Sequence, residues 1–197
     1  MQTNSNHGFT LIELLVSISI MITLLGVVVF NYRGASDRLD LNAAVQEVAI
    51  AIRQAQVYGL GVREDAPSGG NFGYGYGVYF NPVSSQSDYY LFIDKDATNT
   101  YLHGNGCGSS PTECVEKFVL RNNVRIVSVC DGSGNCYSTG QTTLHIKFLR
   151  PDPAAILTFI NPSGTPSWGN VSSINLISPG GLQATIVVSR TGSIQVQ

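Results

Sequence analysis

The sequence predicts an α+β protein in which a long N-terminal helix packs on a head made of two antiparallel β-sheets. Three observations predict this class. Residues 9–30 form an apolar run whose only charge is Glu13. Apolar residues then recur at spacings of three and four until about residue 60. From residue 69 onward the apolar period is two, and turn residues interrupt it often, which is typical of many short strands following one helix.

The first segment, residues 9–30, is the predicted transmembrane half of the helix. Its 22 residues, at a rise of 1.5 Å each, span about 33 Å, the thickness of a hydrocarbon core. A carboxylate at this depth costs on the order of 3 kcal/mol on insertion scales. Glu13 is therefore a candidate functional residue that needs a positively charged partner.

The second segment, residues 31–61, is the predicted amphipathic half of the same helix. With no proline between residues 9 and 66, the simplest structure is one helix from about Phe9 to about Leu60, loosened at Gly26 and Gly34 and ended near Gly59 and Gly61. The alternative is a shorter apolar helix followed by a separate amphipathic one. One side of this half is apolar and is expected to face the core: Leu41, Val45, Val48, Ile52, Ala55 and Gly59.

The third segment, residues 62–197, is the predicted β-rich head. Its strand candidates lie at residues 73–80, 89–93, 116–120, 124–129, 143–149, 155–160, 174–178, 183–189 and 193–197. In the first of these, tyrosine, valine and phenylalanine alternate with Gly73, Gly75 and Gly77, so another element can approach the glycine face closely. This run is not a nucleotide loop, because the G-x-G-x-x-G pattern requires glycine where Val78 stands.

Four cysteines lie as two close pairs, Cys107 with Cys114 and Cys130 with Cys136. Four cysteines allow three connectivities, and in an exported chain the sequence-local pairing is the simplest. The C-x6-C and C-x5-C spacings do not fit a zinc site, so loop-closing disulfides are expected.

The segment that starts at Asp94 resembles the beginning of a calcium loop, because Asp94, Asp96 and Thr98 offer alternating oxygen ligands. It lacks the glycine expected at the sixth position and the bidentate glutamate expected at the twelfth, where Asn105 stands. Calcium is an alternative here, and a solvated turn without a metal is the interpretation we favour.

Composition and motifs argue against catalysis and against a polyanion partner. Only 12% of the chain is charged, the net charge is −2, and glycine and aromatic residues are abundant, as in extracellular β-domains. His103 and His145 are isolated, and no G-x-S-x-G motif is present. We therefore expect a protein that is not an enzyme and that has no cofactor.

The N-terminus carries a specific resemblance. Gly8, Phe9, Thr10, Leu11, Ile12 and Glu13, followed by an apolar tail, resemble the start of type IV prepilins and type II secretion prepseudopilins. The resemblance implies that residues 1–8 are a leader and that prepilin peptidase cuts between Gly8 and Phe9 and methylates the new terminus. It also implies that Glu13 meets the α-amino group of Phe9 on a neighbouring subunit, and such pairing offsets the cost of burying each charge. The leader has no lysine or arginine, unlike most family leaders.

The C-terminal ATIVVSRTGSIQVQ resembles the last turn and strand of GspH/FimT-type minor pilins and pseudopilins. Members of that family implicated in DNA uptake carry extra arginines there, whereas this chain has Ser193 and Gln195 and keeps only Arg190. The remaining cations that could gather to bind DNA are Lys117, Arg121, Arg125, Lys147 and Arg150.

The resemblance implies a minor pilin or pseudopilin, a structural component of a type II secretion pseudopilus or a type IV pilus. Its expected partners are other pilin or pseudopilin subunits, bound through the N-terminal helix, and prepilin peptidase. The chain is expected to cross the cytoplasmic (inner) membrane once and to export its head. The alternative is a DNA-binding minor pilin for DNA uptake, although nucleic acid is not the expected partner.

Overall fold

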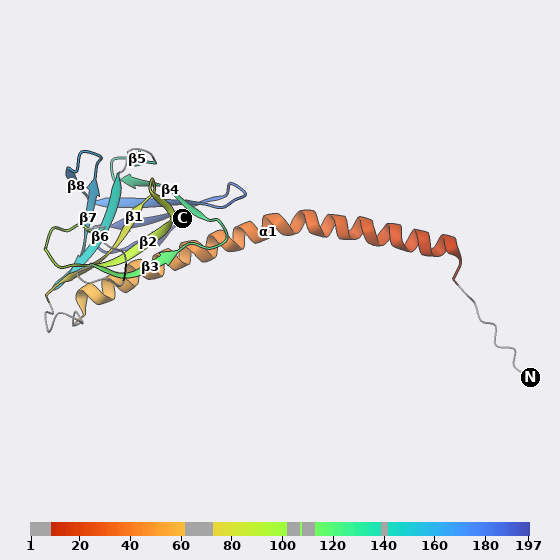
Figure 1. Cartoon of the computed structure of the whole chain (residues 1–197), viewed down its shortest axis with the longest axis horizontal. Helices are drawn as coiled ribbons and strands as arrows, with labels where there is room; N and C mark the ends of the chain where they lie inside the picture. The colour runs from red at the N-terminus through yellow and green to blue at the C-terminus, as the bar shows by residue number, and fades with distance from the viewer. Residues whose placement is uncertain (1–8, 62–72, 102–106, 108–112, 139–141) are drawn as a thin grey trace, which may run out of the picture.

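The chain folds as one long helix packed against two antiparallel sheets (Figure 1), the α+β architecture that the sequence predicts. The computed structural model describes residues 9–61, 73–101, 107, 113–138 and 142–197. Gly8 and the rest of the predicted leader lie outside the described residues, as do His103 and Asn105.

The helix α1 (Leu11–Leu60) is continuous over 50 residues, about 75 Å, so the prediction of a single helix is confirmed and the two-helix alternative is wrong. Thr10 caps its N-terminus, and its hydroxyl accepts a hydrogen bond from the Glu13 amide at 3.3 Å. Gly61 follows its C-terminus and donates its amide to the Val57 carbonyl at 2.9 Å.

The two halves of α1 differ completely in burial. Between Leu11 and Val29 every residue is exposed except the half-exposed Gly26, and the head packs only along the other half (Figure 1). The predicted apolar face of that half is buried, with Val48, Ile52 and Ala55 fully inaccessible to solvent. The amphipathic half is therefore part of the head's core, and the apolar half extends away from the head.

Eleven strands in the described residues make the two sheets. The six-stranded sheet has the order β3 (Cys114–Val119), β2 (Ser85–Asp94), β1 (Gly75–Asn81), β6 (Thr143–Leu149), β7 (Asp152–Ile160) and β8 (Pro166–Gly169). The five-stranded sheet has the order β11 (Ile194–Val196), β10 (Gln183–Ser189), β9 (Val171–Ile177), β4 (Arg125–Asp131) and β5 (Cys136–Tyr137).

Two of these strands, β5 and β8, are absent from the sequence prediction. They are two and four residues long, too short to show a period, and each exists because it pairs with a longer neighbour, β4 or β7. Both lie at the edge of their sheet.

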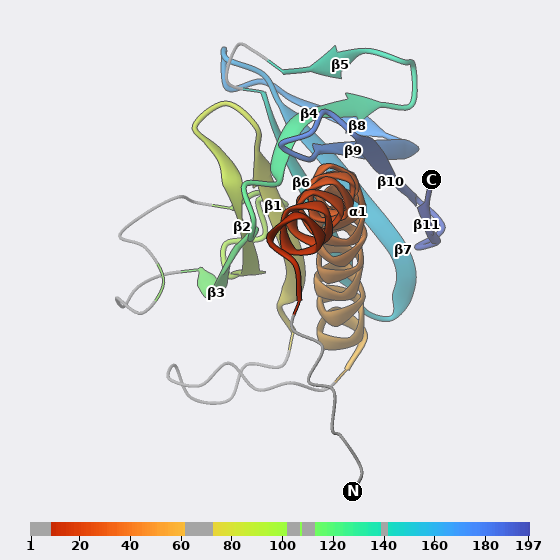
Figure 2. The ribbon, with the colours of Figure 1, turned by 90° about the vertical axis from the view of Figure 1, so that its right-hand side faces the viewer.

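The two sheets share one core with α1, which lies between them in the view along the helix (Figure 2). On the inner face of the larger sheet the strand register aligns aliphatic residues in a row: Leu91, Val78, Ile146 and Leu157. On the smaller sheet Val129, Ile174 and Ile186 align in the same way. Because the strands alternate faces, the outer face of the larger sheet is left for a different set of side chains.

Glycines allow the closest approaches between these elements. A Cβ atom on Gly59 of α1 would lie 2.4 Å from the Phe148 carbonyl oxygen of β6. The Gly59 carbonyl in turn accepts the Arg150 amide at 3.1 Å. The glycine face of β1 that the sequence predicts also allows a close approach, because a Cβ atom on Gly77 would lie 2.7 Å from the Phe92 ring. The backbones of α1 and β6 therefore touch only because residue 59 has no side chain.

We predict that Gly59→Ala destabilises the protein by about 1 to 3 kcal/mol, the usual cost of overpacking against a backbone that cannot move away. The measurement is urea unfolding of the full chain in detergent, followed by circular dichroism. Gly34→Ala is the matched control on the same helix, since nothing lies within 4 Å of its Cβ position. The control should be neutral or stabilising by up to about 1 kcal/mol, and equal stabilities of the two variants would contradict the close contact.

Candidate functional site

The first candidate site is the N-terminal turn of α1. Phe9 is 82% exposed and precedes the capping residue Thr10, and Glu13 is exposed in the first helical turn, where the helix dipole favours a negative charge. Within the described part of the chain Glu13 forms no ion pair. A positively charged partner for Glu13, if the helix lies in a membrane, has to come from outside this part of the chain.

The helix that carries Glu13 contains a window of 18 residues that is apolar and long enough to cross a membrane, and none of that window is buried by the head. Ser17 and Ser19 lie in the apolar half of the helix, and their hydroxyls donate to backbone carbonyls four residues earlier, at 2.7 and 2.9 Å. These serines therefore satisfy their hydrogen-bonding groups within the helix. Between Leu11 and Val29, Glu13 remains the one charged group to be satisfied.

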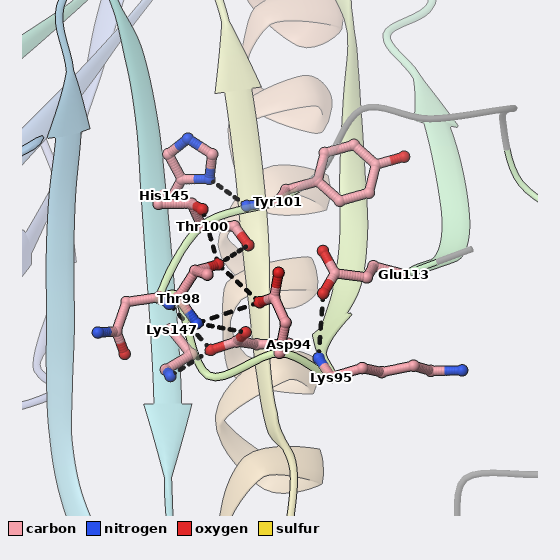
Figure 3. Close-up of polar contacts among 10 residues, drawn as sticks. Asp94, Lys95, Thr98, Thr100, Tyr101, Glu113, His145 and Lys147 are labelled. Carbon is pink, nitrogen blue, oxygen red and sulfur yellow. Dashed lines mark hydrogen bonds and ion pairs between the residues drawn. The ribbon is translucent and has the colours of Figure 1, made fainter. Parts of the chain in front are cut away.

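The second candidate region is the loop from Asp94 to Tyr101, after β2 (Figure 3). Asp94 is 2% exposed, and its two carboxylate oxygens accept the backbone amides of Thr98 and Asn99, both at 3.1 Å. The Lys147 ammonium lies 2.5 Å from the same carboxylate and is also buried. Asp94 therefore closes the loop on itself and is neutralised by a lysine of β6.

Asp96 and Thr98 contact each other. The Thr98 hydroxyl donates to Asp96 Oδ1 at 2.7 Å, and the Thr98 amide donates to the same oxygen at 3.1 Å. Burial raises the pKa of the Asp96 carboxyl, but these hydrogen bonds outweigh burial and hold the pKa below its usual value. The Thr98 hydroxyl is thus oriented by Asp96.

A third acidic residue, Glu113, comes close to these two. Oxygen atoms of Asp94, Asp96 and Glu113 lie within 4.8 Å of one another, a spacing that could hold a cation. Glu113 also accepts the Lys95 amide at 3.0 Å (Figure 3). Sequence reasoning missed Glu113, because it reaches the loop only through the pairing of β2 with the start of β3, where its carbonyl accepts the Ile93 amide at 2.8 Å. No local motif connects it to Asp94.

The far end of the same loop is held by His145. Its Nδ1 accepts the Tyr101 amide at 2.9 Å (Figure 3), and its Nε2 lies 3.1 Å from the Thr143 hydroxyl. The imidazole packs against Tyr79, and burial lowers its pKa to about 3, so it is neutral at physiological pH. His145 and Lys147 lie two residues apart on the outer face of β6 and fix the two ends of the loop.

The Tyr101 ring completes this arrangement. It packs on Tyr79, Tyr90 and Phe92, with ring centroids 5.1, 5.8 and 5.6 Å apart. These aromatic residues form a second small core on the outer face of the larger sheet. The loop thus behaves as a structural cover, held by Lys147 and His145 at its two ends and by the packing of the Tyr101 ring.

Both cysteine pairs are joined in the sequence-local way, Cys107 to Cys114 and Cys130 to Cys136. The second disulfide links residues that face each other across the β4–β5 hairpin. The disulfides fit the expectation of loop closure, and thiols joined in this way are not available as thiolate ligands for zinc.

The five cations considered for DNA binding do not gather on one surface. Lys147 is buried against Asp94, and Lys117 forms an ion pair with Asp88 at 2.6 Å. Arg125 begins β4 in the other sheet, Arg121 lies in the turn before it, and Arg150 follows β6. Lys147 in particular cannot reach a phosphate group without leaving the interior.

Comparison with known proteins adds one finding. The model of a family described as the prokaryotic N-terminal methylation motif matches residues 3–29, which include Phe9, Glu13 and most of the apolar half of α1. No curated protein and no solved structure matches the chain. The motif supports a type IV pilin-like protein anchored in a membrane by its N-terminal helix, and it points to a structural subunit rather than to an enzyme.

We predict that His145 makes the stability of the head depend on pH. In the unfolded chain the imidazole binds a proton below about pH 6.5, whereas in the folded protein it stays neutral to about pH 3. The stability contributed by the neutral imidazole is therefore complete above pH 6.5 and is lost as pH falls, by up to about 1.4 kcal/mol per pH unit. Urea unfolding of the full chain between pH 7 and 4.5 measures this slope before most carboxylates titrate.

His145→Asn is the informative variant, because the side-chain oxygen of the introduced asparagine can accept the Tyr101 amide without titrating. Its stability should vary less with pH than that of the wild type. Parallel curves for the two proteins would show that the buried imidazole is not the source of the dependence.

We also predict that Lys147→Met destabilises the protein by about 3 to 5 kcal/mol, because it leaves the buried Asp94 carboxylate without a counterion. Lys117→Met is the matched control: its partner is Asp88, but the lysine side chain is 44% exposed, and such pairs contribute less than about 1 kcal/mol. Similar losses in both variants would contradict a special role for the buried pair.

Proposed function

We propose that this chain is a minor pilin or pseudopilin, a structural subunit of a type II secretion pseudopilus or of a type IV pilus. In this proposal prepilin peptidase removes residues 1–8 and methylates Phe9. The observation that carries the proposal is the methylation motif at residues 3–29, on a helix whose apolar half is not covered by its own head. A surface of this size needs lipid and then other helices around it.

Glu13 would guide assembly by pairing with the α-amino group of Phe9 on a neighbouring subunit. The exposed carboxylate has no ion-pair partner in the described chain, and a free amino group at residue 9 exists only after cleavage. Pairing two charges in low dielectric stabilises both, and either charge alone is costly there. Uncleaved subunits would therefore be excluded from the filament.

The outer face of the amphipathic half supports contact with other helices beyond the membrane. Leu39, Ile50 and Val57 are 69, 61 and 66% exposed on the side of α1 that faces away from the sheets. At 100° per residue their positions fall within about 20° of one line along the helix. This line of aliphatic side chains extends the exposed apolar surface of the membrane half, as expected if neighbouring helices run alongside α1.

A role in DNA uptake has less support. It requires clustered cations on the head, and of the five candidates Lys147 is buried and Lys117 is paired with an aspartate.

We likewise propose that the Asp94 loop needs no resident metal, because the Lys147 ammonium already supplies a positive charge to its most buried carboxylate. The head would be exported across the cytoplasmic membrane, with the apolar half of α1 as its single anchor.

We predict that Glu13→Ala leaves the protein in the membrane fraction but reduces its incorporation into filaments at least tenfold, because the amino group of its neighbour loses its counterion. The measurement is the amount of this subunit in filaments sheared from cells of the native host. Ser17→Ala, one turn further along the exposed helix, removes a polar group without removing a charge and should incorporate normally.

Mass spectrometry of the purified wild-type subunit tests the processing step at the same time. The mature chain is expected to begin with methylated Phe9. A chain that still begins at Met1, or normal incorporation of Glu13→Ala, would overturn the proposed assembly role.

A further inference from the structure

A groove of about 520 Å³ lies on the head, far from the membrane half of α1, where β6 turns into β7. The residues that line it include Ala154 and Ile156 of β7 and Trp168 of the edge strand β8. Its volume is within the range of about 300 to 1,000 Å³ that is usual for small-ligand sites. None of the functions discussed above uses this groove.

Trp168 is unusual in its exposure. It is the only tryptophan among 197 residues, and 69% of it is accessible to solvent. The other aromatic residues of the larger sheet that form its outer core, Tyr79, Tyr90 and Phe92, are buried. A large flat apolar side chain that stays open beside a groove offers a platform on which a ring can stack.

Charged and polar groups surround this platform. Arg150, Arg190 and Asp152 line the groove, together with Asn170. The backbone of Arg190 is fixed on both sides: its amide donates to the Asn170 carbonyl and its carbonyl accepts the Ala155 amide, both at 2.7 Å. The Asp152 carboxylate is held by the Ala154 amide at 2.9 Å. The backbone of Arg190 and the carboxylate of Asp152 are therefore held in place at the groove.

We propose that this groove binds an acidic sugar unit of an oligosaccharide, with a pyranose ring stacked on Trp168 and its carboxylate on Arg190. The C–H bonds of a pyranose face are apolar and match the indole, and a guanidinium forms paired hydrogen bonds with a carboxylate. Sugar hydroxyl groups are donors as well as acceptors, and Asp152 and Asn170 provide the acceptor oxygens they need.

The groove is less suited to single-stranded nucleic acid. Such strands are bound by several successive aromatic platforms, whereas Trp168 is the one aromatic side chain among the residues that line this groove. This inference does not depend on whether the chain assembles into a filament.

The test is titration of the full chain, in a detergent without a sugar headgroup, with trigalacturonate at about 0.15 M salt, where the Debye length is about 8 Å. Because Trp168 is the only tryptophan, the intrinsic tryptophan fluorescence reports on this groove alone. The expected result is a saturable fluorescence change with trigalacturonate and at least tenfold weaker binding of its methyl-esterified form, which lacks the carboxylates.

Variants locate the site. Arg190→Gln should weaken trigalacturonate binding about tenfold, and Trp168→Ala should abolish the heat of binding in calorimetry. Arg125→Gln is the matched control, an exposed arginine at the start of β4 that does not line the groove, and it should bind normally. No saturable change in the wild type, equal losses in both arginine variants, or tighter binding of an oligothymidylate than of trigalacturonate would each overturn the proposal.

Discussion

The structure depends on the burial of one face of α1 between two sheets. Val48, Ile52 and Ala55 have no accessible surface, and they belong to the same core as the inner residues of both sheets. Because the helix contributes a third wall to this core, the head cannot separate from it without exposing all of that apolar surface. The apolar half of α1 is a direct continuation of this buried half. The head is therefore connected by a continuous helix to the part of α1 that would pack in a filament.

Strand β6 connects the two sides of the larger sheet. Its inner residues Leu144, Ile146 and Phe148 pack in the core with α1, and its outer residues His145 and Lys147 hold the two ends of the loop after β2. Each outer residue satisfies a buried polar group, a backbone amide in one case and a carboxylate in the other. The acidic residues that could suggest a metal centre therefore have a structural role: they hold the loop that covers the aromatic cluster.

The sequence predicted elements whose signal is local and missed those created by pairing. The buried face of α1 follows from helical spacing, and the longer strands follow from alternation, which is why both were predicted well. Asp94, Asp96 and Thr98 were recognised because they are close together in sequence. Glu113 joins them across a sheet, and Lys147 is 53 residues away from the carboxylate it neutralises, so no local pattern could reveal either of them. Strand β8 and its exposed Trp168 were missed for the same reason.

By itself the sequence determined the α+β class and the apolar segment with its lone carboxylate, and it favoured a single long helix, since each of these follows from hydrophobic spacing along one segment. Tertiary structure alone decided which strand faces which, that Trp168 and Arg190 line one groove, and that a lysine lies against Asp94. Contacts of this second kind join segments that are distant in the chain, and they depend on strand register, which shifts a side chain to the opposite face when it changes by a single residue.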